Sequence, residues 1–217
     1  MSKPRSAPLQ SCCEPVVQSA RDYFGMYHHI VAGLPYDVID LAVHELMHSY
    51  ENRKSVFLFG NGGSAALASH FACDLGKGTV LNGNGQKRFR VMALTDNIPL
   101  MTAWANDSCY EQIFAEQLRN FVAAGDVAFA ISGSGNSPNV LRGLEVARSH
   151  GARTIGLTGF EGGKMRGLCD VCIVLPSDNM QVIEDFHLSV THAIFSVIRQ
   201  RISDGQVQKL AATGTCD

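Results

Sequence analysis

Two short loops rich in serine and glycine could bind a small anion. They are residues 60–64 (Gly-Asn-Gly-Gly-Ser) and 132–137 (Ser-Gly-Ser-Gly-Asn-Ser), and each lies between an apolar strand-like run and a helix-like segment. Glycine lets the backbone approach a ligand, and the free N–H groups of a helix N-terminus attract an anion. Neither loop is a nucleotide-binding P-loop, because no Gly-Lys-Ser/Thr follows it. One such loop alone is equally well explained as a capped turn, but two of them predict a phosphate site.

Histidines and carboxylates on two helical segments could bind a metal ion. His70 and Asp74 are four residues apart and therefore lie on one helix face. Glu184 and His192 are eight apart near one stripe of another helix, with His187 between them. Two histidines and two carboxylates suit a tetrahedral zinc ion. Either pair alone is more often a solvated helix face or a hydrogen-bonded core histidine, but two pairs favour a metal site.

Two further motifs match metal-binding patterns less well. Residues 44–48 read His-Glu-Leu-Met-His, the zinc metalloprotease pattern, but they precede the expected sheet and lack a metzincin-type extension. We interpret them as a surface helix or a subunit contact. Cys169-x-x-Cys172 resembles half of a zinc knuckle, but it has no second pair and overlaps the expected strand 170–175. We interpret these cysteines as core residues.

Apolar strands alternate with helices along most of the chain. Two helices are expected first, at about 15–31 and 36–52. The expected strands are 55–59, 89–94, 126–131, 153–158 and 170–175, and the expected helices between and after them are 64–77, across 97–122, 137–150, near 161–167 and 178–202.

This alternation predicts an α/β fold with a doubly wound, five-stranded parallel sheet in the order 2-1-3-4-5. In that order the winding reverses between strands 1 and 3, and ligands bind beyond the carboxyl ends of the strands at this point. The two Ser/Gly loops follow strands 1 and 3, so we expect them to face each other there.

Composition indicates one domain of ordinary character. The 217 residues carry a formal net charge of −2, which does not suggest a basic nucleic-acid surface, and no stretch is apolar enough for a membrane span. Seven scattered cysteines indicate reduced thiols, so we expect a cytoplasmic protein. We expect a flexible N-terminus at 1–14, one domain at 15–202 with a helical extension at 15–52, and a flexible tail at 203–217.

The ordered motifs of residues 15–202 resemble the sugar isomerase (SIS) domain family, and within it the phosphoheptose isomerases. The resemblance rests on both Ser/Gly loops, on His-Phe-Ala at 70–72, and on Glu184-x-x-His187-x4-His192. It also rests on Leu-Thr-Asp at 94–96, Asn-Asp at 106–107 and Leu-Thr-Gly-x-x-Gly-Gly-Lys-Met at 157–165.

The resemblance implies an SIS-domain fold and an aldose–ketose isomerase that acts on a phosphosugar. The substrate it implies is sedoheptulose 7-phosphate, converted to D-glycero-D-manno-heptose 7-phosphate through an enediolate. It further implies a homotetramer with sites at subunit contacts, and one Zn²⁺ per subunit. The residues carried over are Asn61, Gly62, Ser64, Asp96, Ser132, Ser134 and Ser137 for substrate and phosphate; His70, Asp74, Glu184 and His192 for metal; and Asp74, Glu184 and His192 for catalysis.

The sequence departs from the family pattern at three positions. Asp74 stands where the family usually has a Glu that is its proposed base, and Glu184 stands where the family has a Gln metal ligand. Gly78 replaces a usual Arg. Either Asp74 or Glu184 could therefore act as the base, and the sugar could differ.

A second hypothesis follows from the same resemblance. Some proteins with this domain are binding proteins without known activity, including a regulator that engages the bacterial replication initiator. A non-catalytic phosphosugar-binding or initiator-binding protein would keep the second Ser/Gly loop, residues 132–137 (the serine loop), and lose the metal residues. Two histidines and two carboxylates are retained here, which favours the enzyme.

Overall fold

The computed structural model describes residues 17–81 and 86–213. Within them, five parallel strands form a sheet in the order β2-β1-β3-β4-β5, so the predicted order is confirmed. The expected flexible segment 1–14 lies outside the described residues. The strands are β1 (Ser55–Gly60), β2 (Arg90–Ala93), β3 (Val127–Ile131), β4 (Arg153–Thr158) and β5 (Val171–Val174).

Helices precede the sheet, connect its strands and follow it. Short helical turns also occur, one of them a π-helical turn, η1, directly after α4. The helices and turns are α1 (Ala20–Gly25), α2 (Tyr27–Ala32), α3 (Tyr36–Glu51), α4 (Gly63–Cys73), η1 (Asp74–Gly78), α5 (Ile98–Asp107), η2 (Tyr110–Gln112), α6 (Ala115–Phe121), α7 (Pro138–Ser149), η3 (Lys164–Gly167) and α8 (Met180–Thr213).

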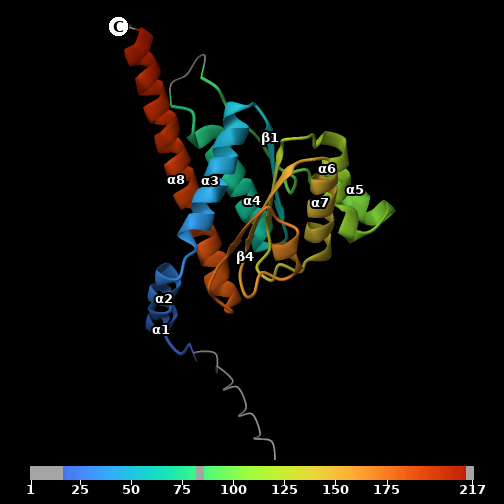
Figure 1. Ribbon diagram of the computed structural model, residues 1–217. Helices are drawn as coiled ribbons and strands as arrows, with labels where there is room; N and C mark the ends of the chain where they lie inside the picture. The colour runs from blue at the N-terminus through green and yellow to red at the C-terminus, as the bar shows by residue number, and fades with distance from the viewer. Residues whose placement is uncertain (1–16, 82–85, 214–217) are drawn as a thin grey trace, which may run out of the picture.

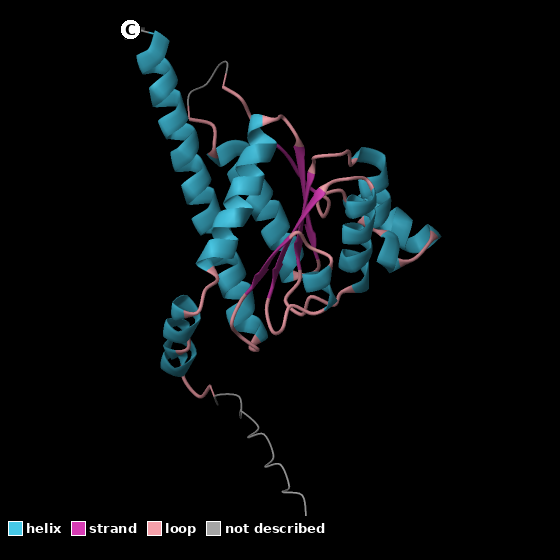
Figure 2. Cartoon of the chain, in the orientation of Figure 1, coloured by secondary structure: helices cyan, strands magenta, loops and turns pink. Residues whose placement is uncertain are grey.

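The sheet is covered by helices on both faces, as Figures 1 and 2 show. Helices α3, α4 and α8 lie on one face, and α5, α6 and α7 lie on the other. Side chains of β1 alternate between the two cores, because successive strand residues point to opposite faces. Leu58 belongs to the core under α3 and α4, whereas Phe59 belongs to the core under α6 and α7.

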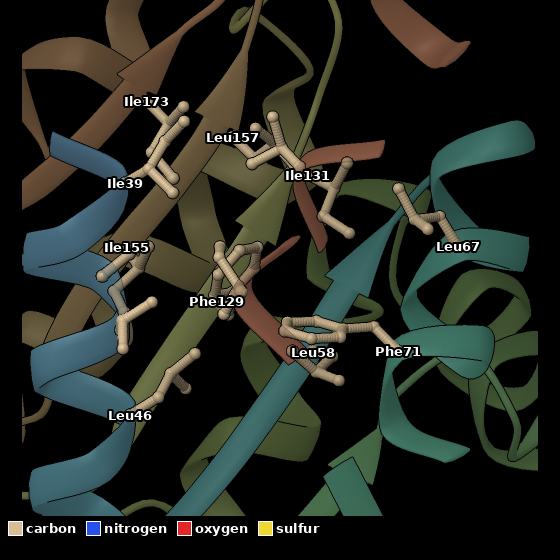
Figure 3. Close-up of a cluster of buried hydrophobic side chains, with 14 of the residues drawn as sticks. Ile39, Leu46, Leu58, Leu67, Phe71, Phe129, Ile131, Ile155, Leu157 and Ile173 are labelled. Atoms are coloured by element: carbon tan, nitrogen blue, oxygen red, sulfur yellow. The ribbon is translucent and has the colours of Figure 1, made fainter. Parts of the chain in front are cut away.

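The core on the α3 side fixes α4 against the middle of the sheet. Phe71 of α4 and Phe129 of β3 are fully buried, and their ring centroids are 5.4 Å apart. Figure 3 shows them beside Leu58, with Leu46 and Ile39 of α3 packed against the neighbouring strands. Burial of such side chains contributes about 1.5–3 kcal/mol each, so α4 is held firmly against the strands.

Two helix boundaries differ from the sequence prediction. The helix expected at 15–31 is two short helices, because Ser19 and Asp22 form a capping box that starts α1 and Gly25 ends it. The helix expected to end at 202 continues to Thr213, so the tail expected to be flexible from 203 is helical up to that residue. This added segment contains no proline that would stop a helix. Among the described residues, no helix is long and apolar enough to cross a membrane.

The two Ser/Gly loops leave neighbouring strands at the same edge of the sheet. Gly60 of β1 pairs with Ile131 of β3, so the loops begin side by side. A Cβ at Gly60 would lie 2.6 Å from the Ile131 carbonyl oxygen, and only glycine fits. Gly62 has φ +54°, a left-handed conformation that turns the chain into α4. The predicted crevice therefore lies where the winding reverses.

Candidate active site

A small hollow of about 160 Å³ lies between the two Ser/Gly loops. The hydroxyl oxygens of Ser132 and Ser137 are 3.2 Å apart at one end of it. Ser137 also precedes α7, so the positive end of this helix lies beside the hollow. An anion is favoured there. The lining residues are Asn61, Ser64, Ile131, Ser132, Gly133, Ser134, Ser137, Met180 and Glu184.

The segment after β4 supports the serine loop through hydrogen bonds from its backbone amides. The amide of Met165 donates to the carbonyl of Gly135 at 3.0 Å, and the amide of Lys164 donates to Oδ1 of Asn136 at 3.0 Å. Gly135 has φ +63°, and a Cβ there would lie 2.1 Å from the Gly162 carbonyl. The serine loop is therefore held in one conformation by contacts that need glycine.

Three of the four predicted metal ligands come together. His70 lies in the last turn of α4, Asp74 begins the π-helical turn η1, and His192 comes from α8. The Nε2 atoms of the two histidines are 2.9 Å apart, and Oδ2 of Asp74 lies 3.4 Å from His70 Nε2 and 3.7 Å from His192 Nε2. π-Helical turns often occur at functional sites.

This cluster suits a cation. Oδ2 of Asp74 is buried and makes no hydrogen bond within the described part of the chain. Ligand atoms bound to tetrahedral zinc at about 2.0–2.2 Å lie roughly 3.3–3.6 Å apart, which is close to the two distances from Asp74, whereas the two histidine nitrogens would have to move apart. Three protein ligands with an open fourth position are typical of catalytic rather than structural zinc. Among the described residues, no other group of three such side chains gathers in this way.

Glu184 lies outside the cluster, between it and the serine loop. It lines both the small hollow and a larger one of about 340 Å³, which extends to His70. Ser64 also lines both hollows. The Glu184 carboxylate approaches the first residue of α4 so closely that a Cβ on Gly63 would lie 3.0 Å from it. The two hollows therefore adjoin at Ser64 and Glu184, and the larger one reaches His70, one member of the cluster.

Two predicted sugar contacts are already engaged by other side chains. Asn61 and Asn139 exchange two amide hydrogen bonds of 2.8 Å, and the Tyr110 hydroxyl donates to Asn61 at 3.1 Å. Asn61 thus ties the first loop to α7, although it still lines the small hollow. Asp96 accepts a hydrogen bond from Ser69 and lines a separate hollow beside β2. This contact attaches Asp96 to α4, and its contact with the sugar stays a prediction.

Buried His187 is a feature of the site to which the sequence assigned no role. Its side chain is 1% exposed, lines the larger hollow and leaves Nε2 without a hydrogen-bond partner among the described residues. Burial lowers the pKa of His187 to about 4, although its interaction with the Thr158 backbone opposes the shift. The ring is therefore neutral at pH 7. Its spacing of three residues from Glu184 was the only signal available in the sequence.

The N-terminal helices also contact the site through Asp185, which lines the larger hollow. The hydroxyls of Tyr23 and Tyr27 both donate to Oδ2 of Asp185, and burial is the main cause of the raised pKa of each tyrosine. Two tyrosines from α1 and α2 therefore fix the start of α8 beside Glu184. No local sequence pattern pairs these residues, which are far apart in the chain.

The HExxH motif on α3 has a structural explanation. Glu45 accepts hydrogen bonds from Arg153 at 3.1 and 3.2 Å, and Arg153 also lies 3.5 Å from Asp170. His44 and His48 are exposed, and no third ligand joins them among the residues that the structure describes. The interpretation as a surface helix agrees with this arrangement.

Known proteins match this chain along most of its length. A model of the SIS domain matches residues 29–159. The phosphoheptose isomerase of Trichlorobacter lovleyi is 34% identical over 192 residues, which cover 85% of this chain and 92% of the relative. That of Aliarcobacter butzleri is 40% identical over 157 residues, which cover 72% of this chain and 82% of the relative. The chain belongs to the SIS domain family and, within it, to the phosphoheptose isomerases.

Solved phosphoheptose isomerases share the fold. The enzyme of Neisseria gonorrhoeae superposes with a TM-score of 0.73 at 29% identity, covering 82% of this chain and 92% of its own. That of Francisella tularensis gives a TM-score of 0.75 at 27% identity, covering 84% of this chain and all of its own. The resemblance stated from the motifs is confirmed.

Removing hydroxyls from the serine loop should weaken phosphosugar binding. Ser134→Ala and Ser137→Ala each delete one hydrogen-bond donor at the small hollow, and a bond to a charged group contributes about 1.5–3 kcal/mol. We expect roughly ten- to hundredfold weaker binding by calorimetry for each. Ser149→Ala, at the other end of α7, is the matched control. Unchanged affinity in both loop variants would contradict the phosphate assignment.

Neutral His187 should make stability fall at acidic pH. Its pKa is about 4 in the folded protein and about 6.5 in an unfolded chain, so the unfolded state binds more protons between these values. The contribution of neutral His187 to the free energy of unfolding is fully present above pH 6.5. It is lost as pH falls towards 4, by about 3 kcal/mol at most.

Denaturant unfolding at several pH values should show a shallower pH dependence for His187→Gln than for the wild type. His48→Gln removes an exposed histidine and should keep the wild-type dependence. If the free energy of unfolding depended on pH equally in His187→Gln and in the wild type, burial would not be what lowers the pKa of His187.

Proposed function

We propose that this protein isomerises sedoheptulose 7-phosphate to D-glycero-D-manno-heptose 7-phosphate. The observation that carries the proposal is the pair of adjoining hollows that extends from the serine loop past Glu184 to His70, which belongs to the cluster with Asp74 and His192. A substrate held by its phosphate at one end would place its remaining atoms towards the cluster. Membership of the phosphoheptose isomerases supports the same reaction.

The serine loop would hold the phosphate and thereby orient the sugar. Binding energy from a group remote from the reacting carbons can fix their position, which lowers the barrier to reaction. The proposed contacts come from the hydroxyls of Ser64, Ser132, Ser134 and Ser137, beside the N-terminus of α7. Asn61 supports this arrangement by tying the two loops together.

His70, Asp74 and His192 would hold one Zn²⁺. When bound there, zinc would supply positive charge for the oxygens of an enediolate. Asp74 is one methylene shorter than the Glu of the family, and its Oδ2 already lies near both histidines. This position would allow Asp74 to bind the metal ion together with the two histidines.

Glu184 would be the base that moves a proton between C1 and C2. Its carboxylate has no hydrogen-bond or ion-pair partner among the described residues, and it lines both hollows. A general base must reach its proton directly, and geometry is the first criterion. Of the two carboxylates that the sequence leaves as alternatives, Glu184 is the one free to act on substrate.

Substitutions at these positions should separate metal binding from proton transfer. We expect His192→Ala to lose zinc and turnover together. Glu184→Gln should keep zinc but slow turnover about 10²–10⁴-fold, the usual contribution of a general base. Zinc is measured by elemental analysis, and turnover by isomerisation of sedoheptulose 7-phosphate. His44→Ala, in the exposed HExxH motif, is the control and should change neither.

If Asp74→Asn stops turnover with zinc retained while Glu184→Gln does not, Asp74 is the base instead. Absence of zinc from carefully prepared wild-type protein, with activity unchanged by chelators, would overturn the metal assignment. Absence of any turnover with phosphorylated heptoses would overturn the proposed reaction.

We also propose that four copies assemble through the N-terminal helices. Several large apolar side chains on α1, α2 and α3 are exposed in the single chain, among them Phe24 at 61%, Val31 at 47% and Leu41 at 55%. Apolar groups gathered on one layer often mark a subunit interface. The tetramer implied by the family resemblance would cover them.

Light scattering should therefore give the mass of a tetramer at micromolar concentration. Leu41→Glu should lower that mass, because it places a charge in the proposed contact. Asp40→Ala, on the same helix, is the control. A stable wild-type monomer would contradict the assembly.

A further inference from the structure

Two thiols meet in the space above Gly156. Gly156 of β4 pairs with Cys172 of β5 in the sheet, and Cys169 lies two residues before the start of β5. A Cβ on Gly156 would lie 2.7 Å from Sγ of Cys169 and 3.3 Å from Sγ of Cys172. Each thiol is the largest influence on the pKa of the other. The missing side chain of Gly156 therefore provides the room in which the two sulfur atoms meet.

The environment distinguishes the two sulfurs chemically. The interaction with Cys169 and the nearby charge of Arg166 lower the pKa of Cys172, although burial opposes the shift. The same interaction and burial raise the pKa of Cys169. Both side chains are only partly buried. Cys172 is thus suited to attack as a thiolate, because the thiolate is the reactive form of cysteine.

The pair is connected to the serine loop through η3. The amide of Cys169 donates to the carbonyl of Met165 at 3.2 Å, at the end of this turn. The amide of Met165 in turn donates to Gly135 of the serine loop, and that of Lys164 donates to Asn136. A displacement at Cys169 would therefore reach the loop that faces the small hollow.

We propose that Cys169 and Cys172 are a redox-active dithiol that closes into an intramolecular disulfide and thereby weakens phosphate binding at the serine loop. The oxidant is a low-molecular-weight disulfide such as glutathione disulfide. The Cys172 thiolate attacks one sulfur of the oxidant and releases a thiolate. Cys169 then attacks the mixed disulfide and releases the second thiolate. Its proton goes to a released thiolate, and a second proton comes from water, so one disulfide forms as another is reduced to two thiols.

Closure changes the geometry of η3. A disulfide requires a sulfur–sulfur bond of about 2.0 Å, much shorter than a contact between two unbonded thiols. Cys169 lies outside the strand whereas Cys172 is held within β5, so the movement falls mainly on Cys169 and the end of η3. This movement would weaken the hydrogen bonds that Met165 and Lys164 donate to Gly135 and Asn136.

The pair is tested on the full chain with glutathione disulfide, followed by alkylation of free thiols and peptide mapping by mass spectrometry. We expect a disulfide between Cys169 and Cys172 that dithiothreitol reverses. The exposed Cys73 and Cys109 are internal controls and should carry only glutathione adducts. In Cys172→Ser, Cys169 should form no internal disulfide. Glutathione adducts on both Cys169 and Cys172, or two unreacted thiols, would overturn the proposal.

The coupling is tested by calorimetry with inorganic phosphate. Oxidised wild-type protein should bind phosphate several-fold more weakly than reduced protein, and Cys172→Ser should show no such change. Equal affinity of the oxidised and reduced wild type would overturn the coupling. If the reduced protein fails to bind phosphate, the proposed phosphate site fails and the coupling fails with it. Peptide mapping decides the disulfide independently of that result.

Discussion

The parallel pairing of β1 with β3 is the constraint on which the site depends. The winding of the sheet reverses at this pair, so α4 and α7 leave it towards opposite faces. The chain can turn there only because Gly60 has no side chain to meet the Ile131 carbonyl. Two helix N-termini and two polar loops are thereby brought to one edge, where the helix dipoles and the serine hydroxyls favour an anion.

Helix α8 adds side chains that could perform chemistry to this proposed phosphate site. Its buried residues Val190, Ile194 and Ile198 pack it against α3 and α4, which fixes its rotation about its own axis. That rotation places Glu184 beside the N-terminus of α4 and His192 beside His70. The apolar stripe and the functional stripe share one helix, so a change in packing would also misplace the reactive groups.

The strand order and the crevice could be predicted because they follow from local patterns. Each strand is an apolar run, and Gly60 and Gly135 lie where only glycine fits. The roles of Asn61 and Asp96 could not be predicted in this way. Asn61 is engaged by Asn139, and Asp96 by Ser69, and both contacts depend on tertiary packing that no local spacing encodes. The same limit applies to Tyr23 and Tyr27, which meet Asp185 across the fold.

Asp74 and Glu184, the two carboxylates that depart from the family pattern, are best explained together. Asp74 lies within the histidine cluster and lines neither hollow, whereas Glu184 lines both and has no partner in the described part of the chain. If Glu184 were a fourth ligand, two carboxylates would cancel the charge of a zinc ion. With Glu184 outside the cluster, one carboxylate and two histidines would leave a bound zinc ion with a net positive charge, which would stabilise an enediolate oxygen. A base beside the cluster would therefore preserve the positive charge that a base within the cluster would reduce.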